Sequence, residues 1–510
     1  MVDKTSLAFG FLIGASLSAA SAVIFLLATT SASSSRRRPI RRQSSRVVRR
    51  RSTSPRKTHK HSSNNHNDID EDEEIRDGVA GLIGNTPLFR INSLSEATGC
   101  EILAKAEFMN VGGSTKDRVA LGIIDEAEAA GHIVPHRGDT IFEGTVGSTG
   151  ISLAVIARAR GYCCHIVMPD DQAQEKYALL EKLGATVEKV RPVSIVDRNH
   201  FVNLARRRAV EMNKEADRLD AIAAAEADAR HVDGESPNST AGTATGTATP
   251  SLGSLWQSGT LTSATAGAPR GYFCDQFENL ANFHTHYTTT GPELLRQTNG
   301  TMHALVLGAG TGGTLAGLTR YLKPRIPGLL VVLADPTGSG LYHKVKHGVM
   351  YAPTEREGSR KRHQVDTVVE GVGINRLTKN FAKIVKEGYI DEAVHVDDRE
   401  AVEMSRYLVQ QDGLFVGSSS ALNCVAAVRV ARQLGPGHTI VTLICDHGTR
   451  HLTKFWSDEY IEAHGLTPRA TGLEFLDDRP TPELFVKLGP RGGSPSQPQI
   501  ISQAASKSRK

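Results

Sequence analysis

The chain has 510 residues, of which 39% are hydrophobic and 23% are charged, so it is long enough for a large core and more than one unit. Its formal net charge of +5 is concentrated near the N-terminus, and the remainder is not basic enough to indicate nucleic-acid binding. None of its six cysteines shows CxxC spacing, which argues against a disulfide framework or a zinc site and indicates reduced thiols.

The N-terminal segment 5–35 contains no charged residue and is apolar enough for one transmembrane helix, which needs about 20 residues. A cleaved secretory signal is the alternative, but such a signal carries its charges before a shorter apolar core, whereas here arginines follow from Arg36 onward. These arginines should stay on the cytoplasmic side of the membrane. We therefore expect a single-pass anchor with a cytosolic catalytic domain, in the mitochondrial outer membrane rather than the endoplasmic reticulum.

Two segments have compositions that do not favour a packed core. Residues 36–77 are rich in Ser, Arg, His and acidic residues without hydrophobic periodicity, which predicts a disordered basic and acidic spacer. A nuclear-localisation or nucleic-acid role for the arginines is the less favoured alternative. Residues 466–510 predict a flexible C-terminal tail.

Apolar runs typical of buried strands alternate with helical patterns between residues 78 and 465, which we assign to the catalytic domain. Strands are expected near residues 100–108, 140–143, 165–168, 185–190, 304–308 and 331–335, with helices between several of them. This order is typical of an α/β fold with a mostly parallel sheet. Residues 215–270 interrupt it with a helical alanine-rich piece and a Ser, Thr, Gly and Ala stretch, which we interpret as a low-complexity surface insertion.

Three glycine-rich turns connect strand-like runs to helix-like runs. The first, 112–118, holds Lys116 between two glycines and a helix start; the others are 143–150 and 308–314. Glycines before a helix let an anion approach bare N–H groups. A lysine able to form an imine, together with separate glycine loops, is what a pyridoxal phosphate site requires. A Rossmann dinucleotide site is the rival interpretation of the 308–314 turn.

The order of 83–88 (IGNTPL), 110–118, 143–150 and 310–314 resembles the cysteine synthase and cystathionine β-synthase family of fold-type II pyridoxal phosphate enzymes. Within that family the chain is most like membrane-anchored mitochondrial cysteine synthases of fungi. The resemblance implies a tryptophan synthase β-like fold with two open, mostly parallel α/β subdomains, here preceded by the transmembrane helix. It also implies a homodimer.

The same resemblance assigns site residues. Lys116 is the expected Schiff-base lysine and general base. The cofactor phosphate is expected at Gly310, Thr311, Gly312, Gly313 and Thr314. The substrate carboxylate is expected at Thr145, Val146, Gly147, Ser148 and Thr149, with Ser148 also touching the cofactor. At position 146 this chain has Val where the family usually has Ser, and at position 148 it has Ser where the family usually has Asn. Residues 370–374 resemble a segment near the substrate entrance, where a structural glycine role is favoured. No metal is expected.

The partner of the pyridine nitrogen is left open by the sequence. In the family a serine usually meets this nitrogen, and we place the corresponding position at His447. Asp446 in that place would favour a protonated ring and broader side reactions, whereas Thr449 would restore a hydroxyl through a shifted register.

The expected reaction is cysteine synthesis from an O-activated serine and sulfide by β-elimination and β-replacement. Cystathionine formation, cysteine desulfhydration and serine or threonine dehydration are alternatives within the same enzyme class. A membrane-tethered scaffold or sensor with little catalysis is an alternative from a different class.

Overall fold

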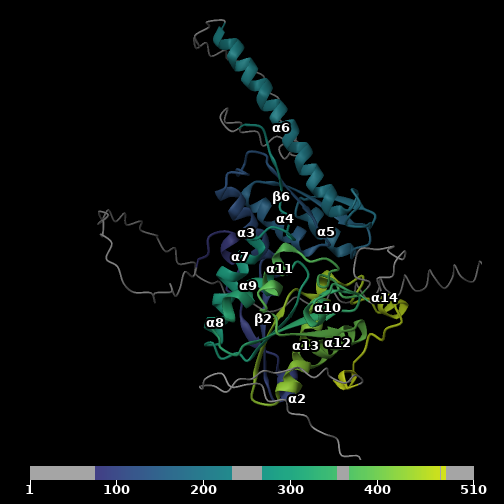
Figure 1. Ribbon diagram of the computed structural model, residues 1–510. Helices are drawn as coiled ribbons and strands as arrows, with labels where there is room; N and C mark the ends of the chain where they lie inside the picture. Colours follow the sequence, from purple (N-terminus) through teal and green to yellow (C-terminus); the bar gives the residue numbers. More distant parts are fainter. Residues whose placement is uncertain (1–74, 233–266, 353–366, 471, 478–510) are drawn as a thin grey trace, which may run out of the picture. The chain divides into compact units, whose positions relative to one another are not determined.

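The computed structural model describes residues 75–232, 267–352, 367–470 and 472–477, which form two β-sheets with helices on their faces (Figure 1). The six-stranded sheet contains β1 (Leu88–Arg90), β2 (Glu101–Ala106), β7 (Ala304–Gly308), β8 (Leu330–Pro336), β9 (Glu392–Val396) and β10 (Thr439–Ile444). The four-stranded sheet contains β3 (Thr140–Gly144), β4 (Cys163–Pro169), β5 (Thr186–Val190) and β6 (Gly271–Phe273).

The six-stranded sheet has the order β1-β2-β10-β7-β8-β9, and only β1 runs antiparallel to its neighbour. Its strands are short runs of Val, Ile, Leu and Ala that are buried on both faces, as expected of parallel strands covered by helices. In the register of the sheet, Ile440 of β10 pairs with Ile102 of β2 and with Ala304 of β7. The C-terminal ends of β2, β7 and β10 therefore lie side by side.

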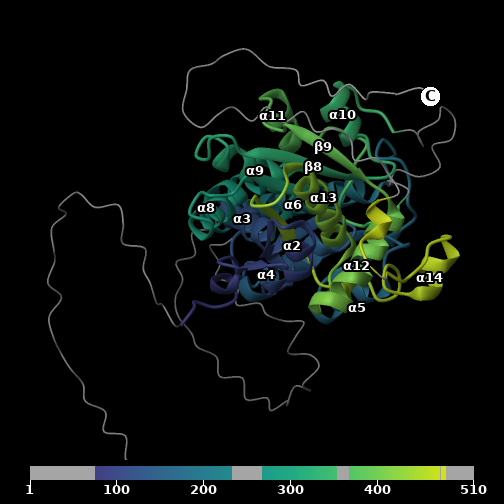
Figure 2. The same ribbon diagram turned by 90° about the horizontal axis from the view of Figure 1, so that it is seen from below.

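Helices cover both faces of this sheet. One face packs against α2 (Asn92–Thr98), α12 (Asp398–Asp412) and α13 (Ser418–Leu434). The other packs against α7 (Ala281–Thr285), α8 (Gly291–Gln297), α9 (Gly313–Leu322), α10 (Leu341–His347) and α11 (Lys379–Lys386). Figure 2 shows α10 and α11 on one side of β8 and β9, and α12 and α13 on the other. A π-helical turn, His286–Thr290, joins α7 to α8, and α14 (Asp458–Ala463) follows the last strand.

The four-stranded sheet has the order β5-β4-β3-β6 and is entirely parallel. Its core forms between β3 and β4 and the helices α3 (Lys116–Ala129), α4 (Ser148–Arg160) and α5 (Gln174–Lys182). The opposite face packs against the first turns of α6 (Phe201–Val232). Helix α6 then continues well beyond the sheet (Figure 1), and it contains the alanine-rich start of the expected insertion.

The described residues confirm the expected strands and the α/β class with two mostly parallel sheets. The antiparallel edge strand β1 and the split of the strands between two sheets depend on pairings between distant segments. No helix among the described residues is both long enough and apolar enough to cross a membrane. The expected anchor at 5–35, residues 36–74 of the expected spacer, residues 233–266 of the insertion and most of the tail lie outside the described residues.

Candidate active site

A cavity of about 350 Å³ lies where the two sheets meet, and it is lined by the turns that follow β3, β7 and β10. Its size is within the range of small-molecule sites, about 300–1,000 Å³. Parallel α/β sheets commonly bind ligands beyond the C-terminal ends of their strands. The cavity brings together Lys116, the residues expected to bind substrate and the glycine turn after β7, all far apart in sequence.

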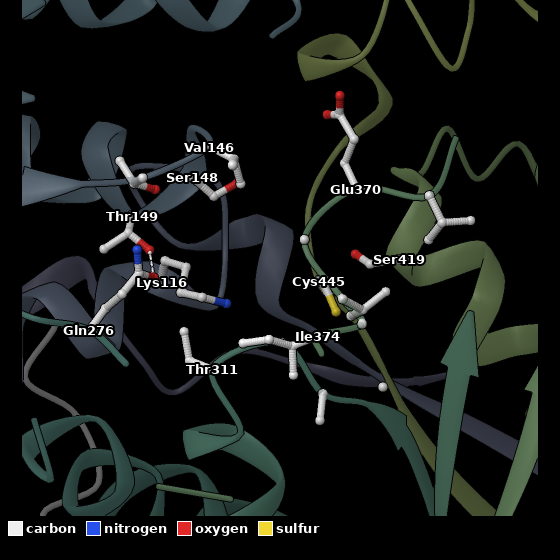
Figure 3. Close-up of a pocket in the computed structure, with 18 of the residues that line it drawn as sticks. Lys116, Val146, Ser148, Thr149, Gln276, Thr311, Glu370, Ile374, Ser419 and Cys445 are labelled. Atoms are coloured by element: carbon white, nitrogen blue, oxygen red, sulfur yellow. Dashed lines mark hydrogen bonds between the residues drawn. The ribbon is translucent and has the colours of Figure 1, made fainter. Parts of the chain in front are cut away.

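Lys116 begins α3, and its amine points into the middle of the cavity (Figure 3). The preceding turn is fixed from several sides: the Asp117 carboxylate accepts from Gly112 N at 2.6 Å, and Thr115 N donates to the carbonyl of Cys445 at 3.1 Å. Burial lowers the pKa of Lys116, while neighbouring groups, including the carboxylate of Asp446, oppose that shift. No hydrogen bond or ion pair engages this amine among the described residues, so it is available for chemistry in the cavity.

The glycine turn after β7 is shaped by close packing. A Cβ at Gly310 would lie 2.5 Å from the carbonyl oxygen of Gly371, and a Cβ at Gly313 would lie 2.0 Å from Asn282 Oδ1, so neither position accepts a side chain without movement. Gly312 has φ +84°, in the region that favours glycine. The backbone then enters α9, whose N-terminal N–H groups provide an anion site.

The two threonines of this turn line the cavity and are held from the side of α7. Thr311 Oγ1 accepts from Asn282 Nδ2 at 2.9 Å, and Thr314 Oγ1 lies 3.1 Å from His286 Nε2. Burial holds the pKa of His286 well below its usual range, so its imidazole is neutral. Two oriented hydroxyls thus accompany the backbone cradle.

The turn after β3 contributes Thr145, Val146, Ser148 and Thr149 to the opposite part of the cavity. Thr149 Oγ1 donates to Gln276 Oε1 at 2.6 Å, and Ser148 Oγ accepts from Arg450 Nη1 at 3.3 Å. Val146 joins a small apolar cluster instead of adding a hydroxyl. The sequence did not single out Gln276, which lies shortly after β6.

The end of β10 differs from the sequence-based expectation for the ring nitrogen. Cys445 and Asp446 line the cavity, but His447 and Thr449 are not among its lining residues. The His447 ring lies beside Phe108 and Phe415 and contacts Thr449. Ser419, at the start of α13, does line the cavity, and it lies across from Lys116 (Figure 3). The serine run 418–420 at a helix start was the signal that could have indicated it.

These residues fit pyridoxal phosphate. The cavity offers an unengaged amine, a backbone anion cradle that a Cβ would fill, and an open space between them. Thr115 adds a buried hydroxyl that has no hydrogen-bond partner among the described residues. An aldehyde, a phosphate and polar ring substituents are the groups that such a donor set accommodates.

Comparison with known proteins agrees with this fit. Residues 79–227 and 209–446 match the family described as pyridoxal-phosphate dependent enzyme. The chain belongs to this family. Within the family it is 51% identical to cysteine synthase 2 of Schizosaccharomyces pombe over 407 residues, which cover 80% of this chain and 90% of that protein. Cysteine synthase 2 of Emericella nidulans is 54% identical over 384 residues, or 75% of this chain and 80% of that protein.

Solved structures of two other enzymes share the fold. An O-acetylserine-dependent cystathionine β-synthase from Helicobacter pylori is 27% identical, with a TM-score of 0.54, and the match covers 74% of this chain and 98% of that one. A hydrogen sulfide-producing enzyme from Fusobacterium nucleatum is also 27% identical, with a TM-score of 0.52 and coverage of 74% and 100%. Pyridoxal phosphate is therefore the cofactor of this chain.

Proposed function

We propose that this chain is a cysteine synthase, which makes L-cysteine from an O-activated serine and sulfide. The observation that carries the proposal is the position of Lys116, whose amine enters a cavity between the Gly310–Thr314 cradle and the hydroxyl-rich Thr145–Thr149 turn. The two fungal relatives named cysteine synthase 2 favour this reaction over others of the family.

The cofactor-binding roles follow from the chemistry of the donors. Lys116 would attach the cofactor aldehyde, and residues 310–314 would hold its phosphate through backbone N–H groups and the Thr311 and Thr314 hydroxyls. The bound cofactor supplies an electron sink for negative charge at the substrate α-carbon. Its ring nitrogen lies across the ring from the aldehyde-bearing carbon, so the wall opposite Lys116 would face it. Ser419 on that wall would present a hydroxyl to the nitrogen, a role for which the sequence suggested position 447.

Lys116 Nζ moves the proton at the substrate α-carbon. Its lowered pKa favours the neutral amine, which is the form that accepts a proton. The Thr145–Thr149 turn and Gln276 would orient the substrate carboxylate, with the N-terminus of α4 adding a favourable dipole. One amine between these two binding elements serves both elimination of the β-substituent and addition of sulfide.

The proposal is tested by product analysis with the purified full-length chain. Incubation with O-acetylserine and sulfide should yield cysteine, and Lys116→Ala should reduce the rate by at least about 100-fold. Borohydride reduction followed by peptide mapping should locate the cofactor on Lys116. Label on another lysine, or no cysteine from a cofactor-loaded wild type, would refute the proposal.

The same assay separates the alternatives. Cystathionine from homocysteine, sulfide from cysteine, or an oxo acid from serine or threonine would indicate the other reactions of this enzyme class. Retention of cofactor with no product from any of these substrates would favour a scaffold or sensor.

Attachment to a membrane and dimer formation are further parts of the proposal. The uncharged 5–35 segment and the arginines after it support an anchor in the mitochondrial outer membrane with a cytosolic catalytic domain. Carbonate-resistant sedimentation with organelle markers, and protease accessibility in intact mitochondria, test this location. Light scattering of the detergent-solubilised chain tests the homodimer; release by carbonate or a monomeric mass would contradict the respective part.

A further inference from the structure

Five charged side chains form a connected cluster at one side of the cavity, and all five line it: Lys176, Glu370, Asp446, His451 and Lys454. The side chains of Lys176 and His451 are each only 3% exposed, so their charges are compensated by partners and not by water. We call these five residues the rim cluster. From the sequence, only Asp446 was considered for a binding role, and Glu370 only as part of a segment near the substrate entrance.

Glu370 is the centre of the rim cluster. Its carboxylate contacts Lys176 Nζ, lies 3.3 Å from His451 Nδ1 and 3.5 Å from Lys454 Nζ. Although burial alone would raise the pKa of Glu370, these cations hold it well below its usual range. His451 is in turn held by Asp446 at 3.1 Å. Glu370 is therefore a charged anchor, and Figure 3 shows its carboxylate turned away from Lys116.

Lys176 connects this anchor to the substrate turn. Gly147 has φ +141°, and a Cβ there would lie 2.6 Å from Lys176 Cδ, so the lysine stem occupies the space beside the glycine backbone. The ammonium of the same side chain contacts Glu370, which belongs to the segment after residue 366 on the other side of the cavity. One extended side chain thus touches the Thr145–Thr149 turn with its stem and the far wall with its charge.

A second contact joins the same two parts of the site. Glu175, the neighbour of Lys176 in α5, accepts from Thr453 Oγ1 at 2.7 Å and from Thr453 N at 3.1 Å. These contacts are more exposed than the Lys176–Glu370 pair. The start of α5 is therefore fixed to the 446–454 segment by Glu175 and to Glu370 by Lys176. Of these two α5 residues, Lys176 is the one whose stem lies beside the substrate turn.

We propose that Lys176, held by Glu370, is a positioning residue that fixes the Thr145–Thr149 turn for binding of the amino-acid substrate. This inference rests on the proposed role of that turn in substrate binding. Loss of the ammonium would leave the stem without its anchor and allow the turn around Gly147 to shift. Substrate binding would weaken, while the cofactor cradle at 310–314, which contacts neither residue, would keep its shape.

The test is a double-mutant cycle on the full-length holoenzyme with Lys176→Met, Glu370→Gln and the double variant, using O-acetylserine and sulfide. Met keeps most of the stem and removes the charge. We expect KM for O-acetylserine to rise about tenfold in each single variant, with kcat changed less than threefold. The double variant should be no worse than the poorer single variant. Lys182→Met, at the exposed end of the same helix, should match the wild type.

The outcomes separate positioning from simple destabilisation. A structural defect alone would reduce the cofactor-loaded fraction and kcat while leaving KM unchanged, and this result would overturn the inference. Additive effects of the two substitutions would also overturn it. If the wild type binds cofactor but makes no cysteine, the proposed function fails; if the wild type makes cysteine and Lys176→Met has the same KM, only the positioning role fails.

Discussion

The two glycine- and threonine-rich turns of the site, 310–314 after β7 and 145–149 after β3, share a local plan but are held in different ways. The first is enclosed by the Gly371 carbonyl and the Asn282 amide, which leave no room for a Cβ at Gly310 or Gly313. The second depends on long side chains from distant segments: Lys176, Gln276 and Arg450. The cofactor turn is therefore fixed by shape, and the substrate turn by partners that can be removed one at a time.

The largest effect is expected in the cofactor turn. Gly313→Ala should weaken cofactor affinity by about 100-fold, because the new Cβ overlaps Asn282 and overpacking of this kind costs about 1–3 kcal/mol. Titration of the apoenzyme with pyridoxal phosphate, followed by the visible absorption of the bound cofactor, measures this change. Unchanged affinity with a raised KM for O-acetylserine would show that the two turns are not fixed differently.

A second difference lies at the strand ends that lead into the turns. Strand β7 ends in Leu307 and Gly308, whereas β3 ends in Glu143 and Gly144, and the Glu143 carboxyl is buried beside Gln276. Burial, with a smaller contribution from Asp275, raises the pKa of Glu143 to about 8. The ordinary pKa of a glutamate, near 4.5, applies in the unfolded chain. Between about pH 4.5 and pH 8, folding therefore takes up a proton, and the free energy of unfolding falls as pH rises.

Glu143→Gln should remove this pH dependence. The quantity to measure, by urea unfolding, is the unfolding free energy of the variant minus that of the wild type. This difference should rise by on the order of 2 kcal/mol between about pH 5 and pH 8. Glu188→Gln in β5 is a control of opposite sign, because a hydrogen bond from Arg208 lowers the pKa of Glu188. That variant should lose stability at neutral pH, and the loss should shrink as pH falls. A constant difference for Glu143→Gln at both pH values would contradict the assignment.

Gln276 provides a test of the substrate turn itself. Gln276→Ala removes the acceptor for the Thr149 hydroxyl, and KM for O-acetylserine should rise about tenfold while cofactor affinity stays within a factor of two. Thr149→Val breaks the same hydrogen bond from the other side. The increase in KM of the double variant should therefore be much smaller than the product of the two single increases. Increases that multiply would show that this hydrogen bond does not hold the turn.

The same contrast explains how far the sequence could predict the site. Lys116 and the glycines of 310–314 were predictable because local backbone requirements near a helix start are written in adjacent residues. Gln276 was not, because nothing near it in sequence shows that it enters the cavity, and for Ser419 the only local signal is a serine run at a helix start. The sequence also could not show that His447 lies outside the cavity lining, because the direction of its side chain depends on the distant Phe108 and Phe415.

The fold, like the site, was predictable where local patterns determine it and not where distant segments pair. Apolar runs between turns predicted most strands, because parallel strands buried on both faces need few polar residues. The separation of β3–β6 from the other strands depends on long-range pairings, such as β2 with β10, for which no local pattern exists. The rim cluster also joins three distant segments, so no local pattern in the sequence indicates that its charges lie together.

The smallest effect is expected from Arg450, which forms a hydrogen bond with Ser148 of the substrate turn. Its guanidinium is buried, donates to Ser148 Oγ at 3.3 Å, and has no carboxylate within ion-pair distance among the described residues. Arg450→Met keeps the aliphatic part of the side chain but removes the donor, so KM for O-acetylserine should rise about threefold, as for one long hydrogen bond. Arg450→Lys should recover part of this loss. If Ser148→Ala raises KM equally and the double variant shows no further change, Arg450 acts through Ser148. A change in cofactor affinity in Arg450→Met, with KM unchanged, would instead show that Arg450 supports the Lys116 turn and not the substrate turn.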